Sequence, residues 1–166
     1  MKAEVPSSLS LSQFKSSVRE LPSKESAILR EKYIASFVDI NLEFYRKNIH
    51  RLELHVDGWC YEGYLWDCLK GPTVIPFADL EALMLAAPGS VLVMWDIHSS
   101  DKVPIPDYWK FHKAAILEIP ATVLVRNFQH LPEDLYVFDR QFTRTLVVTH
   151  EEARNGGRLC LLKVLE

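Results

Sequence analysis

The sequence lacks the short motifs that mark the common nucleotide-binding enzymes. It contains neither GxxxxGK(S/T) nor GxGxxG, and its adjacent glycines, Gly156 and Gly157, lie in a turn between predicted strands. Such motifs supply the backbone amides and the lysine that hold phosphate groups. Their absence argues against a nucleotide enzyme of the common folds, and nothing else in the sequence indicates a cofactor.

Cysteine and long apolar runs are also scarce. The chain has three cysteines, Cys60, Cys68 and Cys160, which cannot all pair with one another, and the spacing of the first two fits no common zinc pattern. We expect buried free thiols in a reducing compartment. No apolar run approaches the ~18 residues of a membrane span, and the N-terminus lacks the apolar core of a secretory signal. We therefore expect a cytoplasmic protein.

There is no excess of basic residues. The formal net charge is −3 and the isoelectric point is about 6.1. Proteins that bind nucleic acid directly usually carry a strong basic excess. This small excess of acidic over basic residues is compatible with an acidic patch that faces a basic partner. The length of 166 residues, 48% of them hydrophobic, suits one globular domain over residues 1–166, with 1–8 as a loose tail.

Helical patterns are concentrated in the N-terminal half. Apolar residues recur at helical spacing after Ser10, a predicted cap, and again over about residues 24–48. A short helix is predicted near 64–69, another over 77–87, and a further one from Pro106 to about residue 119.

Strand patterns dominate the C-terminal half. Residues 51–56 alternate apolar and polar side chains before an Asp57–Gly58 turn, and 90–97 form a nearly continuous apolar run of strand length. Further strands are predicted over 121–128, 135–139, 144–152 and 158–165. The sequence therefore predicts an α+β fold, with helices mainly from the N-terminal half packed on a mixed, mostly antiparallel sheet built largely from the C-terminal half.

Catalytic patterns are weak. His150-Glu151-Glu152 resembles the first half of HExxH, but the fourth position after His150 is Arg154, and the histidine is predicted at the end of a strand. No GxSxG motif is present. We predict no catalytic residues and no metal ligands, with a small metal-dependent hydrolase using His150 and Glu151 or Glu152 as an alternative.

Carboxylates gather instead at predicted loops, with aromatic residues beside several of them. Aromatic anchors surrounded by charged residues are typical of protein interfaces. We predict these partner-binding residues: Trp95, Asp96, Glu133, Asp134, Asp139, Phe142, Glu151 and Glu152.

Two stretches carry a family resemblance. GYLWDCLK (residues 63–70) and LPEDLYVFDRQFTRTLVVTHEE (residues 131–152) resemble segments of small bacterial immunity proteins from polymorphic-toxin and contact-dependent-inhibition systems. The resemblance implies a cytoplasmic antitoxin that binds one cognate toxin domain and blocks its active site. Together with the acidic loops and the absence of catalytic motifs, it leads us to expect a non-enzymatic inhibitor of a toxin such as a basic nuclease. From the charge and the lack of long apolar runs we expect no membrane partner and no direct nucleic-acid contact. A non-catalytic structural or oligomeric subunit remains a second alternative.

Overall fold

The structure is a computed structural model that describes residues 8–49, 62–86, 89–98, 103–154 and 156–165, together with the backbone of 54–55 and 58–59. The predicted roles of Asp57, Cys60 and most of the tail 1–8 therefore lie outside the described residues. Within the described part, no helix has the length and apolar character needed to span a membrane.

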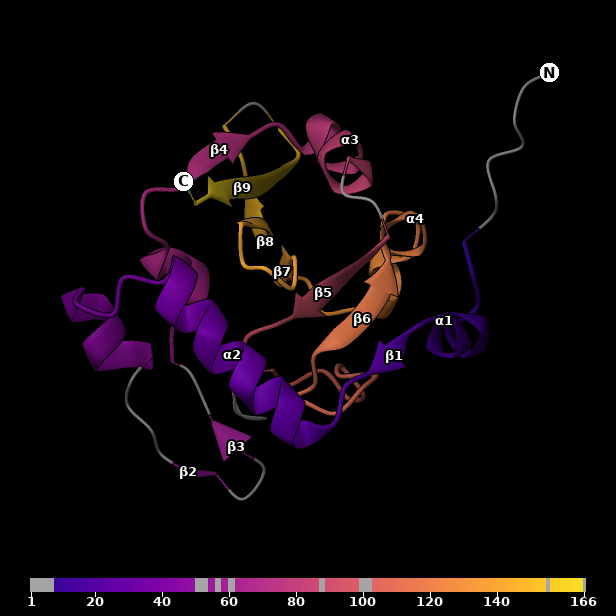
Figure 1. Cartoon of the computed structure of the whole chain (residues 1–166), viewed down its shortest axis with the longest axis horizontal. Helices are drawn as coiled ribbons and strands as arrows, with labels where there is room; N and C mark the ends of the chain where they lie inside the picture. The colour runs from indigo at the N-terminus through magenta and orange to yellow at the C-terminus, as the bar shows by residue number, and fades with distance from the viewer. Residues whose placement is uncertain are drawn as a thin grey trace.

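Helices and strands follow one another in an α+β order, which confirms the predicted fold class (Figure 1). The helices are α1 (Leu11–Ser17), α2 (Ser23–Phe37), α3 (Leu80–Leu85) and α4 (Ala121–Leu124). A π-helical turn, η1 (Tyr45–Ile49), and the 3-10 turns η2 (Leu65–Cys68), η3 (Phe77–Asp79) and η4 (Phe128–His130) complete the helical elements. The strands are β1 (Arg19–Glu20), β2 (Leu54–His55), β3 (Gly58–Trp59), β4 (Thr73–Ile75), β5 (Ser90–Met94), β6 (Leu117–Pro120), β7 (Leu135–Phe138), β8 (Arg144–Glu152) and β9 (Arg158–Val164).

Seven of the strands form one sheet in the order β1-β6-β5-β7-β8-β9-β4. Each neighbouring pair is antiparallel, so the sheet is antiparallel throughout. A separate two-stranded hairpin pairs β2 with β3. The predicted strand over 51–56 is described only at Leu54–His55.

Both faces of the large sheet are covered. Tyr136 and Phe138 of β7 pack with α2 on one face, whereas Leu135 and Val137 pack with α1, α3 and α4 on the other. In Figure 1, α2 accordingly lies on one side of the sheet and the three shorter helices on the other. This alternation is the one predicted from the sequence of the hairpin, because successive side chains of a strand point to opposite faces.

The second helix is shorter than its pattern predicts. It ends at Phe37 rather than near residue 48. The backbone amide of Asp39 donates to the Cys68 carbonyl (2.7 Å), and that of Lys70 donates to the Phe37 carbonyl (2.9 Å). Pairing with the segment after η2 therefore replaces the next helical turn, and the chain becomes helical again at η1.

Two further predictions are wrong, in opposite directions. Residues 106–119 were expected to be helical, but Leu117–Pro120 form β6, which lies between β1 and β5 and supplies backbone partners to both. Residues 121–128 were expected to be a strand, but Ala121–Leu124 form α4 directly after Pro120. The buried side chains of Leu117 and Ile119 alternate with half-buried neighbours, and this strand period was obscured by the helix formers before it.

Candidate functional site

An aspartate and a histidine meet where β7 begins and β8 ends. Asp134 precedes β7, and the pairing of Leu135 with Val148 brings it beside His150. The His150 amide donates to Asp134 Oδ1 (3.0 Å), and His150 Nδ1 lies 3.0 Å from both carboxylate oxygens. Asp134 is buried and His150 is exposed. The carboxylate therefore fixes the orientation of the imidazole at the surface.

Two aromatic residues from the turn η2 and its entry pack against this histidine. The rings of Tyr64 and Trp66 are stacked, with centroids 5.4 Å apart. The Tyr64 ring lies 5.0 Å from the His150 ring and 4.9 Å from the His98 ring. Tyr64 is half-buried and Trp66 is buried beneath it, so Tyr64 presents the accessible ring of this group.

Buried hydrogen bonds fix the position of η2. The Leu65 amide donates to Asp96 Oδ1 (2.9 Å), and the Trp66 amide donates to the Tyr136 hydroxyl (3.0 Å). That hydroxyl in turn donates to Asp96 Oδ2 (2.7 Å). Strand β7 and the segment after β5 thus hold the turn through these side chains, and the aromatic group is in place before any partner arrives.

Carboxylates surround the aromatic group. Asp67, Glu133 and Glu151 are exposed. Burial raises the pKa of Asp67, and the charges of Glu151 and Asp134 raise it further. Burial likewise raises the pKa of Tyr64, with the carboxylates of Asp134, Asp96, Asp67 and Glu151 adding to the effect. These groups are therefore close enough to interact electrostatically.

One more aromatic residue joins them. The Glu133 amide donates to the hydroxyl of Tyr108 (3.1 Å), whose pKa is raised by burial and by the nearby Asp134 and Glu133 carboxylates. Eight residues together make up what we call the acidic–aromatic surface: Tyr64, Trp66, Asp67, Tyr108, Glu133, Asp134, His150 and Glu151.

Arg158, which contacts the loop before β7, forms no ion pair with these carboxylates among the described residues. Arg158 Nε donates to the Thr149 carbonyl (2.8 Å), and its Nη2 donates to the Glu133 carbonyl. Its hydrogen bonds therefore go to backbone carbonyls of the sheet and the loop before β7, and none among the described residues goes to a carboxylate. The surface remains able to accept cations from outside.

Half of the predicted partner-binding residues lie at this end of the β7–β8 hairpin. Glu133, Asp134, Glu151 and Glu152 come together here, although Asp134 is buried and acts through His150. Glu152 pairs with Arg158 at the end of the ladder.

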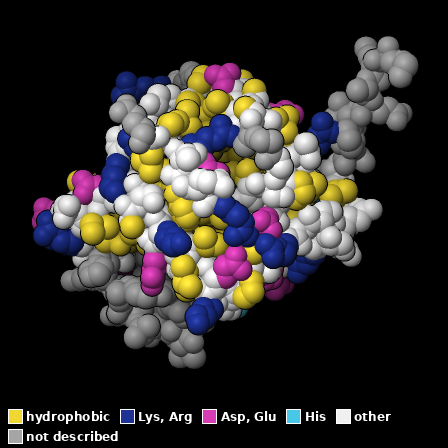
Figure 2. Space-filling view, viewed as in Figure 1, with side chains coloured by type: hydrophobic (Ala, Val, Ile, Leu, Met, Phe, Trp, Pro, Cys, Tyr) yellow, Lys and Arg dark blue, Asp and Glu magenta, His cyan; other side chains and the backbone are white. Residues whose placement is uncertain are grey.

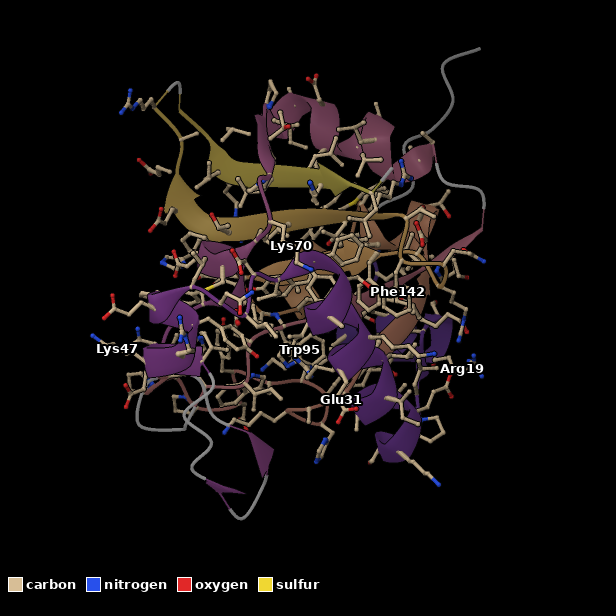
Figure 3. All side chains as sticks on the ribbon, turned by 60° about the vertical axis from the view of Figure 1, so that its left-hand side comes forward. Arg19, Glu31, Lys47, Lys70, Trp95 and Phe142 are labelled. Atoms are coloured by element: carbon tan, nitrogen blue, oxygen red, sulfur yellow. The ribbon has the colours of Figure 1, made fainter. Side chains whose placement is uncertain are left out.

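The other four lie elsewhere. Asp139 and Phe142 are at the opposite end of the hairpin, where the Asp139 carboxylate accepts the amides of Thr143 (2.9 Å) and Arg144 (3.2 Å). Phe142 packs on Phe138, with ring centroids 5.5 Å apart. Asp139 therefore orders the loop, and Phe142 closes the core beside α2 (Figure 3).

Trp95 and Asp96 do not form part of an exposed surface. They are 1% and 3% exposed, respectively, and Figure 3 shows Trp95 inside the molecule. Trp95 Nε1 donates to the Lys113 carbonyl (2.8 Å), so this aromatic residue is a core side chain. Trp95 was predicted to bind a partner because it lies beside Asp96 at the end of the predicted strand 90–97, but the chain stays buried through Ile97. Asp96 contributes indirectly, because it anchors η2.

The histidine and its neighbours do not form a metal centre within the described residues. No group of three or more His, Cys, Asp or Glu side chains is placed there to hold a metal ion. Asp134 orients the His150 ring as an acid orients the base of a nucleophilic triad. In the described part of the chain, however, no hydroxyl or thiol side chain is hydrogen-bonded to that ring.

Sequence reasoning left several members of the surface out of the predicted set. Tyr64, Trp66 and Asp67 belong to the stretch GYLWDCLK, and Tyr108 belongs to a segment predicted as helix. Their aromatic character beside carboxylates was the available signal. Only the hydrogen bonds to Asp96 and Tyr136 place η2 against a hairpin about 70 residues away.

Comparisons with known proteins add no family to this description. The chain matches no protein-family model, no curated protein and no solved structure. What the surface could bind must therefore be inferred from its own chemistry.

Proposed function

We propose that this chain is an immunity-type protein of the bacterial cytoplasm, which binds a basic toxin domain through the acidic–aromatic surface and blocks the toxin's active site. One observation carries the proposal. The two stretches that resemble immunity proteins, residues 63–70 and 131–152, meet in space through the contact between Tyr64 and His150. Residues far apart in the sequence thus form one surface with one chemical character.

The charge of this surface suits a basic partner. Exposed carboxylates of Asp67, Glu133 and Glu151 would attract lysine and arginine side chains and speed the encounter. By contrast, basic and acidic side chains are interspersed over α2 on the face shown in Figure 2. The helix face therefore has no comparable concentration of one sign.

The aromatic members would supply affinity and specificity. An arginine that approaches Asp67 or Glu151 would also meet the Tyr64 ring, and cations bind favourably over aromatic faces. Tyrosine and tryptophan are enriched among the few residues that dominate binding energy at interfaces. Because η2 is already held by Asp96 and Tyr136, binding would cost little conformational entropy of the main chain.

The test uses the toxin domain encoded beside this gene, expressed in its host with and without the full chain. We expect the chain to protect the cells and to bind the purified toxin one to one. The double variant Asp67→Lys, Glu151→Lys should weaken binding by 100-fold or more, since charge reversal at an interface costs several kcal/mol. The matched control is Glu81→Lys, an exposed reversal on α3, which should leave the affinity unchanged.

Two results would contradict the proposal. The first is an absence of protection and of binding with the neighbouring toxin domain. The second is binding that the double variant leaves intact, which would place the interface elsewhere.

The affinity of the chain for the toxin domain should also fall steeply between low and high salt, because screening weakens exposed charge pairs.

The Asp134–His150 pair favours one second candidate, a metal-dependent hydrolase that uses His150, although no group of three metal ligands is assembled among the described residues. A metal-binding histidine usually donates the N–H of its other ring nitrogen to a carboxylate, and His150 Nδ1 is placed to donate to Asp134 in this way. Elemental analysis of protein purified without chelators discriminates between the two functions. One equivalent of zinc or manganese, lost in His150→Ala, would favour the hydrolase over the binding protein.

A further inference from the structure

A partly open cavity lies beside α2 and shares no lining residue with the acidic–aromatic surface. It has a volume of about 510 Å³ and is lined by residues of α2, of η1 and of the segment from Ile97 to Ala115. Cavities of roughly 300–1,000 Å³ with mostly apolar walls are typical of small-molecule sites. The cavity therefore has the size of a ligand site, and its walls indicate which ligand.

The walls are mainly aliphatic. Leu21, Ile34, Ile49 and Ile97 contribute side chains, and Tyr45 adds an aromatic ring. Three of these are almost fully buried in the fold, at 1–3% exposure (Leu21, Ile49 and Ile97). Their positions are fixed by the core, so the cavity is a preformed apolar space that would favour an apolar ligand body.

One wall carries a buried cation. Arg30 of α2 lines the cavity and is 6% exposed. Its Nη1 donates to the Trp95 carbonyl (2.9 Å), whereas its Nη2 is buried and has no hydrogen-bond partner among the described residues. A guanidinium stays charged at any physiological pH, and a buried donor without a partner is costly.

The remaining charged residues of the cavity lie toward solvent. Glu20, Glu31 and Arg46 line it and are exposed, and Arg46 Nη2 donates to the Asn41 carbonyl (2.7 Å). Glu31 is labelled on α2 in Figure 3. These exposed side chains are of mixed sign, whereas Arg30 is the one buried charged residue among those that line the cavity.

We propose that this cavity binds a small amphipathic carboxylate, with its apolar chain against the aliphatic walls and its carboxylate paired with Arg30. A carboxylate is planar and accepts two parallel hydrogen bonds, which matches the donor fork of a guanidinium. It would supply an acceptor and a counter-charge to a guanidinium whose Nη2 has no hydrogen-bond partner among the described residues, once that group turns toward the cavity. The cavity and the acidic–aromatic surface are distinct sites, so this inference does not rest on the partner-binding proposal.

The test is calorimetric titration of the full chain with sodium decanoate below its micelle concentration. Decanol and decyltrimethylammonium serve as neutral and cationic compounds of equal chain length. Decanoate should bind one to one, and at least about tenfold more tightly than decanol, because hydrogen bonds to charged groups are worth more than neutral ones. Each CH₂ removed, down to octanoate, should weaken binding by up to about fourfold.

Two variants distinguish the head group from the cavity. Arg30→Met should reduce decanoate affinity to that of decanol. Ala27→Phe, which fills the cavity from α2 without altering Arg30, should weaken both ligands at least tenfold. Ala82→Phe, an exposed site on α3, is the matched control and should change neither. Circular dichroism confirms that each variant is folded.

Several outcomes would overturn the assignment. They are no binding of decanoate, equal affinity for decanoate and decanol, or binding that Ala27→Phe leaves intact. If Arg30→Met does not fold, the comparison of decanoate with decanol and the Ala27→Phe variant still decide the question in the native chain.

Discussion

Asp96 should make the protein progressively less stable as the pH rises from 3.8 to about 7. Its side chain is buried, and burial raises its pKa from 3.8 to about 7. Hydrogen bonds from the Tyr136 hydroxyl and the Leu65 amide favour the ionised form and partly oppose this rise. The positive charge of Arg30 also opposes it, but forms no ion pair with Asp96 among the described residues. Asp96→Asn removes the ionisable group at nearly constant volume.

The sign follows from proton binding in the two states. Between pH 3.8 and about 7, unfolded Asp96 is ionised while the folded carboxyl keeps its proton. Unfolding then releases a proton, and the free energy of unfolding falls as the pH rises. The contribution is about 1.4 kcal/mol per pH unit between the two pKa values and about half of that at the folded pKa, so the step from pH 5 to pH 7 is worth roughly 2 kcal/mol. Above pH 7 this contribution levels off.

The assay is urea unfolding of the wild type and Asp96→Asn at half-unit steps from pH 5 to pH 8. Taking the difference between the two proteins cancels the groups they share. The wild type should lose roughly 2 kcal/mol relative to the variant between pH 5 and pH 7. Asp79→Asn, at an exposed site of η3, controls for replacing a carboxylate. If the stability of the wild type minus that of the variant stays constant or increases with pH, the reasoning is refuted, because the hydrogen bonds to Asp96 would then outweigh its burial.

Three other substitutions test separate features. Tyr33→Phe removes the buried hydrogen bond to Thr145 (2.9 Å) and should lower the free energy of unfolding by about 1 kcal/mol in urea titrations; no change would show that the bond is not formed. Ser10→Ala removes the reciprocal cap of α1 and should cost about 1 kcal/mol, seen as faster amide exchange in that helix; unchanged exchange would contradict the cap. Burial opposes ionisation of Glu118, but its hydrogen bonds and ion pairs with Arg19 and Arg140 outweigh burial and lower the pKa of Glu118. Glu118→Gln should therefore cost up to about 1 kcal/mol at low salt and little in 1 M salt, and a loss that persists in high salt would point to packing instead.

The sequence was most informative where one local rule acts alone. Ser10 is followed by a helical apolar pattern, and it caps α1 as predicted. Residues 135–152 alternate along two strands, and their register places Tyr136 and Leu135 on opposite faces. Strand alternation and capping depend on near neighbours, so they can be predicted before the fold is known.

Predictions failed where distant backbone groups compete for the same residues. The pattern of the second helix continues beyond Phe37, but pairing with Cys68 and Lys70 ends it there. Leu117–Pro120 follow helix formers, but β1 and β5 offer hydrogen bonds on both sides. In such segments, tertiary pairing outweighs propensities that differ by less than about 1 kcal/mol per residue.

Local sequence patterns predict the α+β class, the two covered faces of the hairpin and the stretches that carry aromatic and acidic residues. The tertiary structure brings only some of these stretches together. It buries Trp95 and Asp96, separates Asp139 from Glu133, and places Tyr64 against His150. It also leaves the cavity beside Arg30. The physical reason is that local patterns fix which side of an element is apolar, whereas sites form where elements distant in sequence pack together.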